Sequence, residues 1–409
     1  MTGAAPRQST IFEAGRWSAI ALGASIPVSI AIDNLLLAIV LFTWLIGGQL
    51  RTKLGLTLHN PVYRAAALLF GVLLLGSLYG PATWGDTRLH LSKYLELLLI
   101  PAMGWYFLKQ KNRLVGLRVF AGALFAVLVL SCTFKAGMLP TNPWMHGNAE
   151  TPLVFKLRLT HNILMAFAAF VFAWFAVSAD SRRSTLLWGA ATALAIGNVT
   201  LMINGVTGYL VLGALTLLLG WQYARFKGIG ITLASAIISL GLLMVVPSAF
   251  QTRTQQVIEE LKREDATKPA STSAGFRIEF YRNTIELIAA NPVFGSGTGS
   301  FPALYAEHVK GSGSVATRNP HNEFLLLTVQ TGIFGLGAFL WLLWQQWRYA
   351  PLLPTPMERG LARGLVVMMS IVCLLNSALL DHTEGLLYAW LTALLYAGLP
   401  AGKETGIQT

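Results

Sequence analysis

Apolar runs long enough to cross a lipid bilayer recur along almost the whole chain, and they constrain its fold more than any other feature. A helix needs roughly 20 apolar residues to span the hydrocarbon core. The runs are apolar on all faces and show no single-sided alternation, which argues against membrane strands. Of the 409 residues 54% are hydrophobic and only 12% are charged, against about 25% charged in an ordinary soluble domain. The sequence therefore predicts an all-α, polytopic membrane protein with about twelve transmembrane helices. Their approximate bounds are 17–32, 34–50, 65–80, 91–108, 114–134, 159–178, 184–202, 205–223, 229–247, 322–347, 361–380 and 385–400.

The positive charge of the chain follows the alternation of these runs. With the N-terminus inside, every loop on the inner side is basic, as the positive-inside rule expects. The net charge of +12 is thus interpreted as a topology signal, and a nucleic-acid partner is not expected. Arg7 and Arg16 precede the first run, but no small-residue cleavage site follows, so we expect a retained span rather than a signal peptide. Cys132 and Cys373 both lie inside apolar runs, where small core residues are expected rather than a disulfide.

One long polar interval, residues 248–321, interrupts the apolar pattern and falls on the outer side. Connections between elements usually take about 2–8 residues, so an interval of this length suggests the working part of the molecule. The expected division is therefore transmembrane helices 1–9 in residues 1–247, an outer loop in 248–321, and helices 10–12 with a tail in 322–409. The loop itself predicts helices near 253–264, 275–290 and 301–309.

His321 is the leading candidate for acid–base chemistry. It follows Pro320 at the expected first turn of the tenth span, where the positive end of the helix dipole favours neutral imidazole. Neutral imidazole can accept a proton from a sugar hydroxyl. Glu323 is close in sequence but is expected to point elsewhere on the helix. A capping or interfacial histidine is the alternative.

Two arginines and a tyrosine of the loop are candidate ligands for phosphate. Arg277 lies on the expected loop helix with Tyr281 four residues further on, along the same face. A guanidinium binds phosphate oxygens in a bidentate manner. Arg318, three residues before His321, is a second candidate contact. Solvated surface arginines are the alternative.

Three further patterns are open to two interpretations each. Gly295, Gly297 and Gly299 could expose backbone N–H groups to an anion, but a simple turn is favoured. Lys156, Arg158 and His161 open the sixth span from the outer side, as substrate contacts or as interfacial anchors. Asp381-His382-Thr383-Glu384 forms an outer turn, in which Asp381 is expected to orient a nearby Arg or His rather than to bind a metal.

The combination Arg277-x-x-x-Tyr281, Asn291-Pro292-Val293-Phe294-Gly295-x-Gly297-x-Gly299 and Pro320-His321-Asn322-Glu323-Phe324 resembles the O-antigen ligase / O-antigen polymerase superfamily of membrane glycosyltransferases. Thr331-Gly332-x-x-Gly335 fits as well, and so does a long periplasmic loop between the ninth and tenth of about twelve spans. One departure stands out. Many relatives have an arginine near the start of the eighth span, where this chain reads Asn204-Gly205-Val206-Thr207-Gly208.

The resemblance implies a GT-C-like enzyme of the bacterial inner membrane, with its active site facing the periplasm. It implies a glycan donor linked to undecaprenyl diphosphate and, for a ligase, lipid A–core as the acceptor in lipopolysaccharide biosynthesis. In that family a loop histidine is regarded as the base and loop arginines as diphosphate ligands, roles that fall here on His321 and Arg277. No cofactor or metal is implied, and the sequence has no P-loop or H-E-x-x-H pattern.

The acceptor leaves closely related alternatives open. O-antigen polymerases extend the carrier-linked glycan, and protein O-oligosaccharyltransferases use Ser or Thr. The compact outer turn at 381–384 and the absence of an added soluble domain favour a ligase. A secondary transporter is the alternative from a different class, but the two halves of the sequence show no matching repeat.

Overall fold

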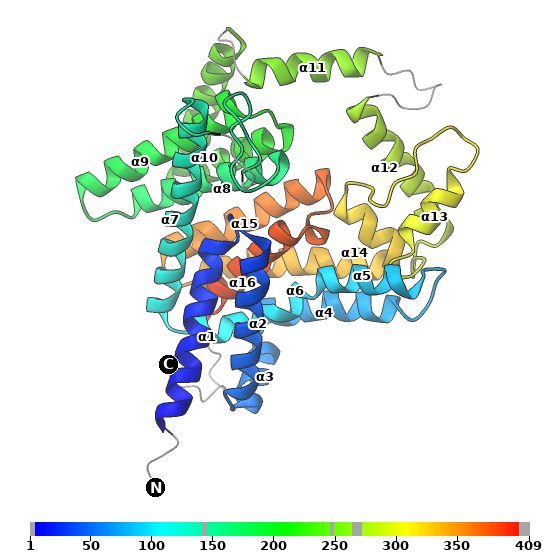
Figure 1. Cartoon of the computed structure of the whole chain (residues 1–409), viewed down its shortest axis with the longest axis horizontal. Coiled ribbons are helices and arrows are strands. Elements are labelled where there is room, and N and C mark those ends of the chain that lie inside the picture. The colour runs from blue at the N-terminus through cyan, green and yellow to red at the C-terminus, as the bar shows by residue number, and fades with distance from the viewer. Residues whose placement is uncertain (1–4, 141–144, 246–248, 264–271, 401–409) are drawn as a thin grey trace.

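The computed structural model describes residues 5–140, 145–245, 249–263 and 272–400, and within these ranges all regular elements are helical (Figure 1). The first half contains α1 (Ala5–Ser25), α2 (Ile30–Ile46), α3 (Leu50–His59), α4 (Pro61–Gly76), α5 (Trp84–Tyr94), α6 (Glu96–Gly104), η1 (Trp105–Phe107), α7 (Gln110–Lys135), α8 (Arg158–Val177), α9 (Arg182–Gly197) and the π-helix η2 (Asn198–Met202). The second half contains α10 (Val206–Val245), α11 (Ala249–Arg263), α12 (Ser273–Ala290), α13 (Phe301–His308), α14 (Glu323–Tyr349), η3 (Ala350–Leu352), α15 (Pro356–Leu375), η4 (Ala378–Leu380) and α16 (His382–Tyr396).

The expected all-α class is confirmed, and several helices have the length and apolarity of membrane spans. Among the described residues five helices qualify, or six if the bent pair α2 and α3 counts as one span. Those five are Gln110–Lys135, Arg158–Val177, Arg182–Met202, Val206–Ser235 and Glu323–Leu352. The count of twelve spans therefore stays a prediction. The other apolar segments lie in helices that are shorter, bent or more charged, such as α4 and α15.

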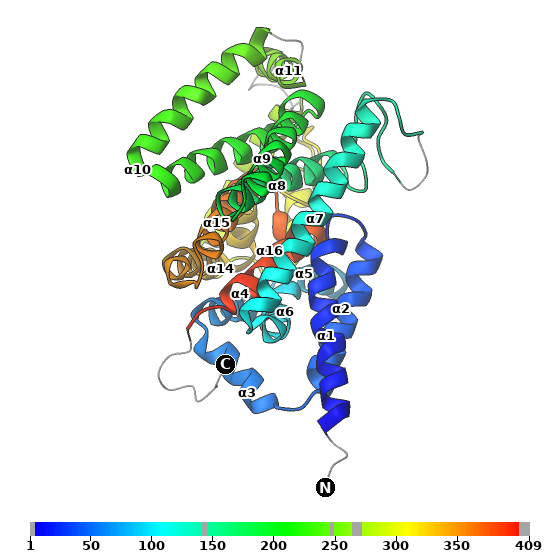
Figure 2. The same ribbon diagram turned by 90° about the vertical axis from the view of Figure 1, so that its left-hand side faces the viewer.

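Helix α10 is two helical segments joined by a sharp turn. Ala224 and Arg225 have non-helical backbone angles, and Arg225 has a φ of +52°. The backbones of Gly220 and Gly228 approach so closely that a Cβ on Gly228 would lie 1.8 Å from the Gly220 carbonyl oxygen. Figure 2 shows α10 turning back on itself at this point. The two apolar runs expected at 205–223 and 229–247 thus have the predicted break between them.

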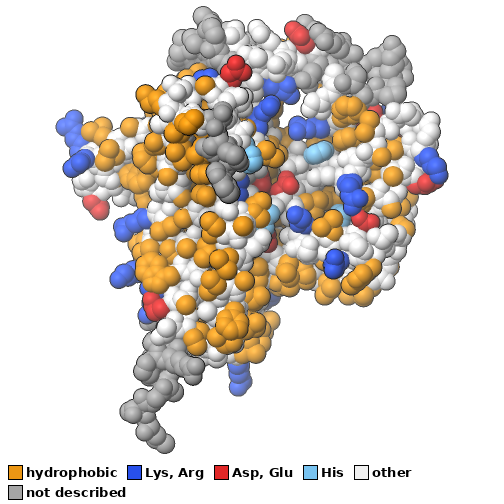
Figure 3. Space-filling view, in the orientation of Figure 1, with side chains coloured by type: hydrophobic (Ala, Val, Ile, Leu, Met, Phe, Trp, Pro, Cys, Tyr) orange, Lys and Arg blue, Asp and Glu red, His pale blue; other side chains and the backbone are white. Residues whose placement is uncertain are grey.

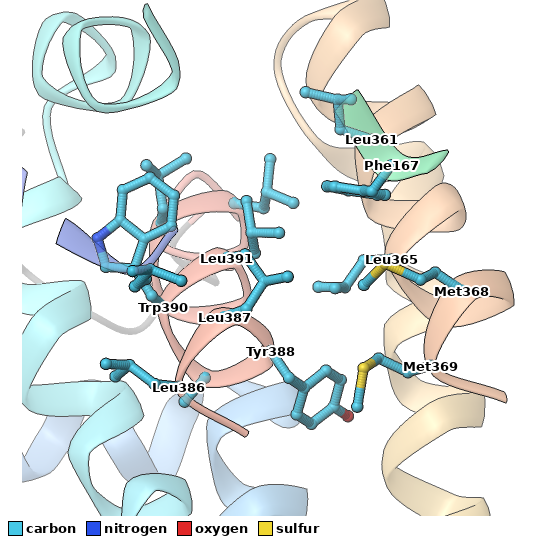
Figure 4. Packing of buried hydrophobic residues seen from close by; sticks show 14 of the residues in the cluster. Phe167, Leu361, Leu365, Met368, Met369, Leu386, Leu387, Tyr388, Trp390 and Leu391 are labelled. Atoms are coloured by element: carbon cyan, nitrogen blue, oxygen red, sulfur yellow. The ribbon is translucent and has the colours of Figure 1, made fainter. Parts of the chain in front are cut away.

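Helix α16 is the centre of the hydrophobic core. Every residue from Thr383 to Tyr396 is buried, which is typical of a helix enclosed by other helices on all sides. Figure 4 shows Trp390 and Leu386 pointing to one side of this helix and Tyr388 and Leu387 towards α15. Two polar side chains of this helix are bonded within the core: the Trp390 indole donates to the Ala19 carbonyl at 2.7 Å, and the Tyr388 hydroxyl donates to Gln346 Oε1 at 2.8 Å.

The described part of the interval 248–321 contains the three helices that the sequence predicts, with ends close to those expected. The Thr272 hydroxyl accepts from the Gly275 backbone N–H at 3.0 Å and caps α12. Asn291-Pro292 follows the last residue of α12, as expected for a chain segment that cannot continue a helix. A small apolar cluster that includes Phe280, Tyr305 and Leu326 fixes α12 and α13 against α14.

The glycine run is a turn inserted between α4 and α14, which agrees with the interpretation favoured from the sequence. Ser296 N donates to the Val329 carbonyl at 2.9 Å, and Gly297 N donates to the Gln330 carbonyl at 2.8 Å. Thr298 N donates to the Gly76 carbonyl at 2.9 Å. These N–H groups are already bonded within the protein, so the anion cradle that the sequence left open is not formed here.

The helix ends meet in two sets. In one set, Asn60 at the start of α4 donates to the Tyr396 carbonyl at the end of α16 at 2.9 Å. Arg113 at the start of α7 pairs in the same set with Glu358 at the start of α15, at 2.7 Å. In the other set, Thr160 at the start of α8 donates to Glu384 at the start of α16 at 2.6 Å. Helices that run alternately up and down through the molecule would bring their ends together in two such sets.

Candidate functional site

His321 lies just before α14 with its backbone in the left-handed region, at a φ of +56°. The sequence placed it in the first turn of the helix, and this detail was wrong. The helix begins at Glu323, because Asn322 takes the capping position and its side chain accepts from the Leu325 N–H at 3.0 Å. The His321 N–H donates instead to Asn319 Oδ1 at 2.8 Å. His321 is therefore held by the segment before the helix.

The hydrogen-bond partner of the His321 ring is an amide that directly follows α15. His321 Nδ1 lies 3.1 Å from Asn376 Oδ1, and Asn376 Nδ2 donates to Asp381 Oδ2 at 2.9 Å. A carboxylate can only accept, so Asp381 fixes which end of the amide faces the ring. His321 Nδ1 must then carry the hydrogen, which in the neutral ring leaves the lone pair on Nε2. This is the form that a general base requires.

Arg277 and His321 line the same cavity. Its volume is about 430 Å³, and the remaining lining residues are Ser273, Phe276, Phe280 and Val315. The Phe280 ring stacks on the imidazole with a centroid distance of 6.1 Å and an interplanar angle of 23°. A cation, a base and an apolar wall are thus combined around one space.

Tyr281 connects α12 to the segment that carries His321 and to the end of α15. Its hydroxyl reaches the His321 carbonyl at 3.0 Å and the Leu374 carbonyl, near the end of α15, at 2.8 Å. Burial raises the pKa of Tyr281, so the hydroxyl stays protonated and can donate. Tyr281 was expected to contact substrate; the structure places it as a tether between α12 and the segment that carries His321.

Arg318 points away from the cavity towards α5. It forms an ion pair with Asp86 at 2.6 Å, and its side chain is 68% exposed. A hydrogen bond from Thr83 and the Arg318 guanidinium lower the pKa of the Asp86 carboxyl. Arg318 is not among the residues that line the cavity with Arg277.

The basic group at the start of α8 lies outside the cavity as well. Lys156 is 7% exposed; burial lowers its pKa, and the nearby carboxylates of Asp33 and Glu384 oppose that shift. Arg158 is exposed at the first residue of α8. His161 is buried, with Nε2 3.3 Å from Asn198 Oδ1.

His382 belongs to a cluster of carboxylates rather than to the cavity. Its Nδ1 lies 3.0 Å from Glu96 Oε1, and its Nε2 lies 3.7 Å from Asp33 Oδ2. Asp33 and Glu96 stabilise the charged ring and raise the pKa of His382 to about 9. Within the described ranges, no three His, Cys, Asp or Glu side chains are arranged to hold a metal ion.

The segment 204–208, where the resemblance implies an arginine, contains two glycines that lie against a neighbouring helix. A Cβ on Gly205 would lie 2.1 Å from Asn162 Nδ2, and one on Gly208 would lie 2.9 Å from Asn162 Cβ. The buried Asn162 side chain thus occupies the space beside the start of α10.

The sequence did not single out Asn376 or Phe280. Asn376 is 55 residues from His321, and nothing in the local sequence predicts that the two meet. The one available signal is that Asn376-Ser377 interrupts an apolar run. Ser377 contributes too, because its hydroxyl donates to Asn319 Oδ1 at 2.7 Å.

Comparison with known proteins gives one family match. Residues 190–340 match the family described as O-Antigen ligase, and the matched range contains Arg277, the glycine turn and His321. No curated protein matches the chain. The family indicates a glycosyltransferase-type enzyme that acts on lipid-linked glycans, and the apolar helices indicate a multi-pass membrane protein. Residues 190–340 thus match the O-antigen ligase family model, in agreement with the resemblance seen in the motifs of the chain.

Proposed function

We propose that this protein is an O-antigen ligase that transfers O-antigen glycan from undecaprenyl diphosphate to a sugar hydroxyl of lipid A–core. One observation supports this reaction above the others: Arg277 and His321 share the wall of a single cavity of about 430 Å³. A glycosyl transfer from a diphosphate carrier needs a base for the incoming hydroxyl and positive charge for the leaving group. The cavity offers one of each.

The proposed step is a single displacement at the anomeric carbon. His321 Nε2 takes the proton of the acceptor hydroxyl while that oxygen forms the new glycosidic bond. The bond between the anomeric carbon and the diphosphate oxygen breaks, and its electron pair stays on the diphosphate. Arg277 offsets the charge that develops there. Because the acceptor attacks opposite the leaving group, the step inverts the anomeric configuration.

The remaining predicted residues take supporting roles in this proposal. Asp381 acts through Asn376 by fixing the amide that orients His321. Tyr281 holds α12 beside the base. Arg318, Lys156, Arg158 and His161 stay candidate substrate contacts outside the cavity, where a long glycan or the acceptor extends beyond the reacting atoms.

We place the protein in the bacterial inner membrane with the cavity on the periplasmic side. The proposed topology has twelve spans, nine in residues 1–247 and three in 322–409, with the loop 248–321 between them. The two sets of helix ends support it. The contact between α4 and α16 joins ends expected inside, and that between α8 and α16 joins ends expected outside.

The test uses His321→Ala in a strain that lacks the native gene, with lipopolysaccharide resolved on a gel. We expect the ladder to collapse to unsubstituted core while carrier-linked O-polysaccharide accumulates. His308→Ala is the matched control, because His308 lies in the same loop but pairs with Glu286 outside the cavity. In the same assay Arg277→Lys should restore only part of the activity that Arg277→Ala loses, since Lys cannot bind phosphate oxygens in a bidentate manner.

Each alternative gives a different pattern. Full ladders with His321→Ala would remove this residue as the base. Core carrying a single repeat would indicate a polymerase, and glycan attached to protein would indicate a protein O-oligosaccharyltransferase. Loss of carrier-linked glycan outside the cytoplasm, with the transfer step intact, would indicate a transporter.

A further inference from the structure

A second and larger cavity lies at the opposite helix ends from the candidate site. Its volume is about 760 Å³, and it is enclosed by the starts of α4 and α7 and by the ends of α3, α14 and α16. Two buried interactions already described hold the helix ends around it: the hydrogen bond from Asn60 to the Tyr396 carbonyl and the ion pair between Arg113 and Glu358. The cavity is therefore part of the packed structure.

The lining of this cavity combines basic and apolar side chains. His59, Arg64, Lys109 and Arg113 contribute the basic groups, and among the described residues no acidic side chain lines it. Arg113 is neutralised by Glu358, whereas Arg64 and Lys109 are exposed and form no ion pair within the described residues. Glu13 interacts electrostatically with Lys109 but pairs with Arg16. The cavity thus presents two available cations to a ligand.

Helix α3, which borders the cavity, has the features of a helix that lies in a membrane surface. It bends by 114° from α2, and Leu50, Leu54 and Leu58 are spaced four residues apart and are 52%, 50% and 63% exposed. One apolar stripe is therefore turned outwards. On another face the Lys53 ammonium is buried against the rings of Trp44 and Trp105, at 5.3 and 5.5 Å from their centroids. With this stripe in the membrane surface, the cavity beside α3 would lie at the depth of the lipid headgroups.

We propose that this cavity binds an anionic phospholipid, with its phosphate against Arg64 and Lys109 and its acyl chains along the apolar wall. Leu56, Leu108 and Leu352 supply that wall. Basic pockets between transmembrane helices on the cytoplasmic side are suited to acidic headgroups, and this is the side on which the proposed topology places these helix ends. The inference does not depend on the reaction proposed for the other cavity.

The test compares lipid retention by full-length protein purified in mild detergent, measured by native mass spectrometry. Wild-type protein should retain phosphatidylglycerol or cardiolipin in preference to phosphatidylethanolamine. The double variant Arg64→Gln/Lys109→Gln should bind the anionic lipid about thirtyfold more weakly, from the energy that basic residues contribute at an anionic surface. Inorganic phosphate should compete poorly, because it cannot use the apolar wall.

The matched control is Arg182→Gln/Arg183→Gln, which removes the same charge from exposed positions at the start of α9, outside the cavity. It should retain lipid as the wild type does. Equal loss in both double variants would mean general attraction to anionic lipid and would overturn the site. Wild-type protein without bound anionic lipid, or full displacement by inorganic phosphate, would also overturn it.

Discussion

At the scale of single residues, side chains from three parts of the chain hold the imidazole of His321, the proposed base. Asp381 orients Asn376, and Asn376 assigns the hydrogen to His321 Nδ1. Phe280 stacks on the ring and limits its rotation. Each contact removes one alternative state of the imidazole, so in the proposed mechanism Nε2 is oriented before a substrate arrives.

The amide makes a specific prediction. Asn376→Leu removes the acceptor for Nδ1–H, so both tautomers of His321 become accessible and kcat should fall roughly tenfold or more, a part of the 10²–10⁴ that a positioned base contributes. Asp381→Asn should have a smaller effect, because the hydrogen bond to His321 remains possible but the amide is no longer locked. Glycan transfer by purified protein would measure both.

The KM values of the two variants separate orientation from binding. They should stay close to that of the wild type, because neither side chain lines the cavity. A large rise in KM with unchanged kcat would contradict the orienting role.

His382 gives a prediction for stability and pH. Its folded pKa of about 9 exceeds the unfolded value of about 6.5, so the charged ring stabilises the fold fully below about pH 6.5. That contribution is lost as the pH rises through 9. The Tm difference between wild type and His382→Gln should therefore shrink between pH 7 and 10 in detergent. A difference that stays constant over this range would mean that the charge of His382 does not contribute.

At the scale of elements, the sequence predicted helix ends and breaks best where neighbouring residues determine them. Thr272 and Asn291-Pro292 mark the ends of α12, and the break in α10 falls between two predicted runs. The division of the fourth apolar segment into α5, α6 and η1 was not predicted. That break places Thr87 of α5 against the Thr298 carbonyl in the glycine turn, and such a contact depends on residues distant in sequence.

The glycine turn can be tested by a matched pair of substitutions. A Cβ at Gly297 would lie 2.1 Å from the Tyr79 carbonyl oxygen, whereas one at Gly311 meets nothing within 4 Å, although both glycines have a positive φ. Gly311→Ala should cost about 1 kcal/mol from backbone strain alone. Gly297→Ala should lower the Tm clearly further, because strain and collision add. Equal Tm values for the two variants would show that the turn does not depend on this close approach.

At the scale of the whole molecule, charge and apolar runs predicted the fold class, but packing lay beyond the sequence. Nothing in residues 382–396 shows that α16 is the helix enclosed by the others. The same holds for the site: the motifs supplied Arg277 and His321, but α15, which brings Asn376 to the ring, has no sequence link to either. Figure 3 shows the resulting contrast between a mostly hydrophobic surface over α1, α2 and α7 and the charged and histidine side chains towards α12 and α13.

The proposed orientation is open to a direct test in intact cells. With Cys132 and Cys373 replaced by alanine, Ser312→Cys should react with a membrane-impermeant maleimide, and Arg183→Cys should react only after permeabilisation. Both positions are exposed in the structure, so accessibility of the side chain does not differ between them. The reverse pattern would invert the topology and move the candidate site to the cytoplasmic side.

The left-handed backbone at His321 has a consequence for how the protein can change over generations. A residue with a side chain costs about 1–2 kcal/mol in this conformation, and glycine would relieve that cost while deleting the imidazole. Selection for robustness and selection for turnover therefore pull this position in opposite directions. In a lineage that no longer needed glycan transfer, replacement of His321 by glycine would therefore be among the first substitutions expected.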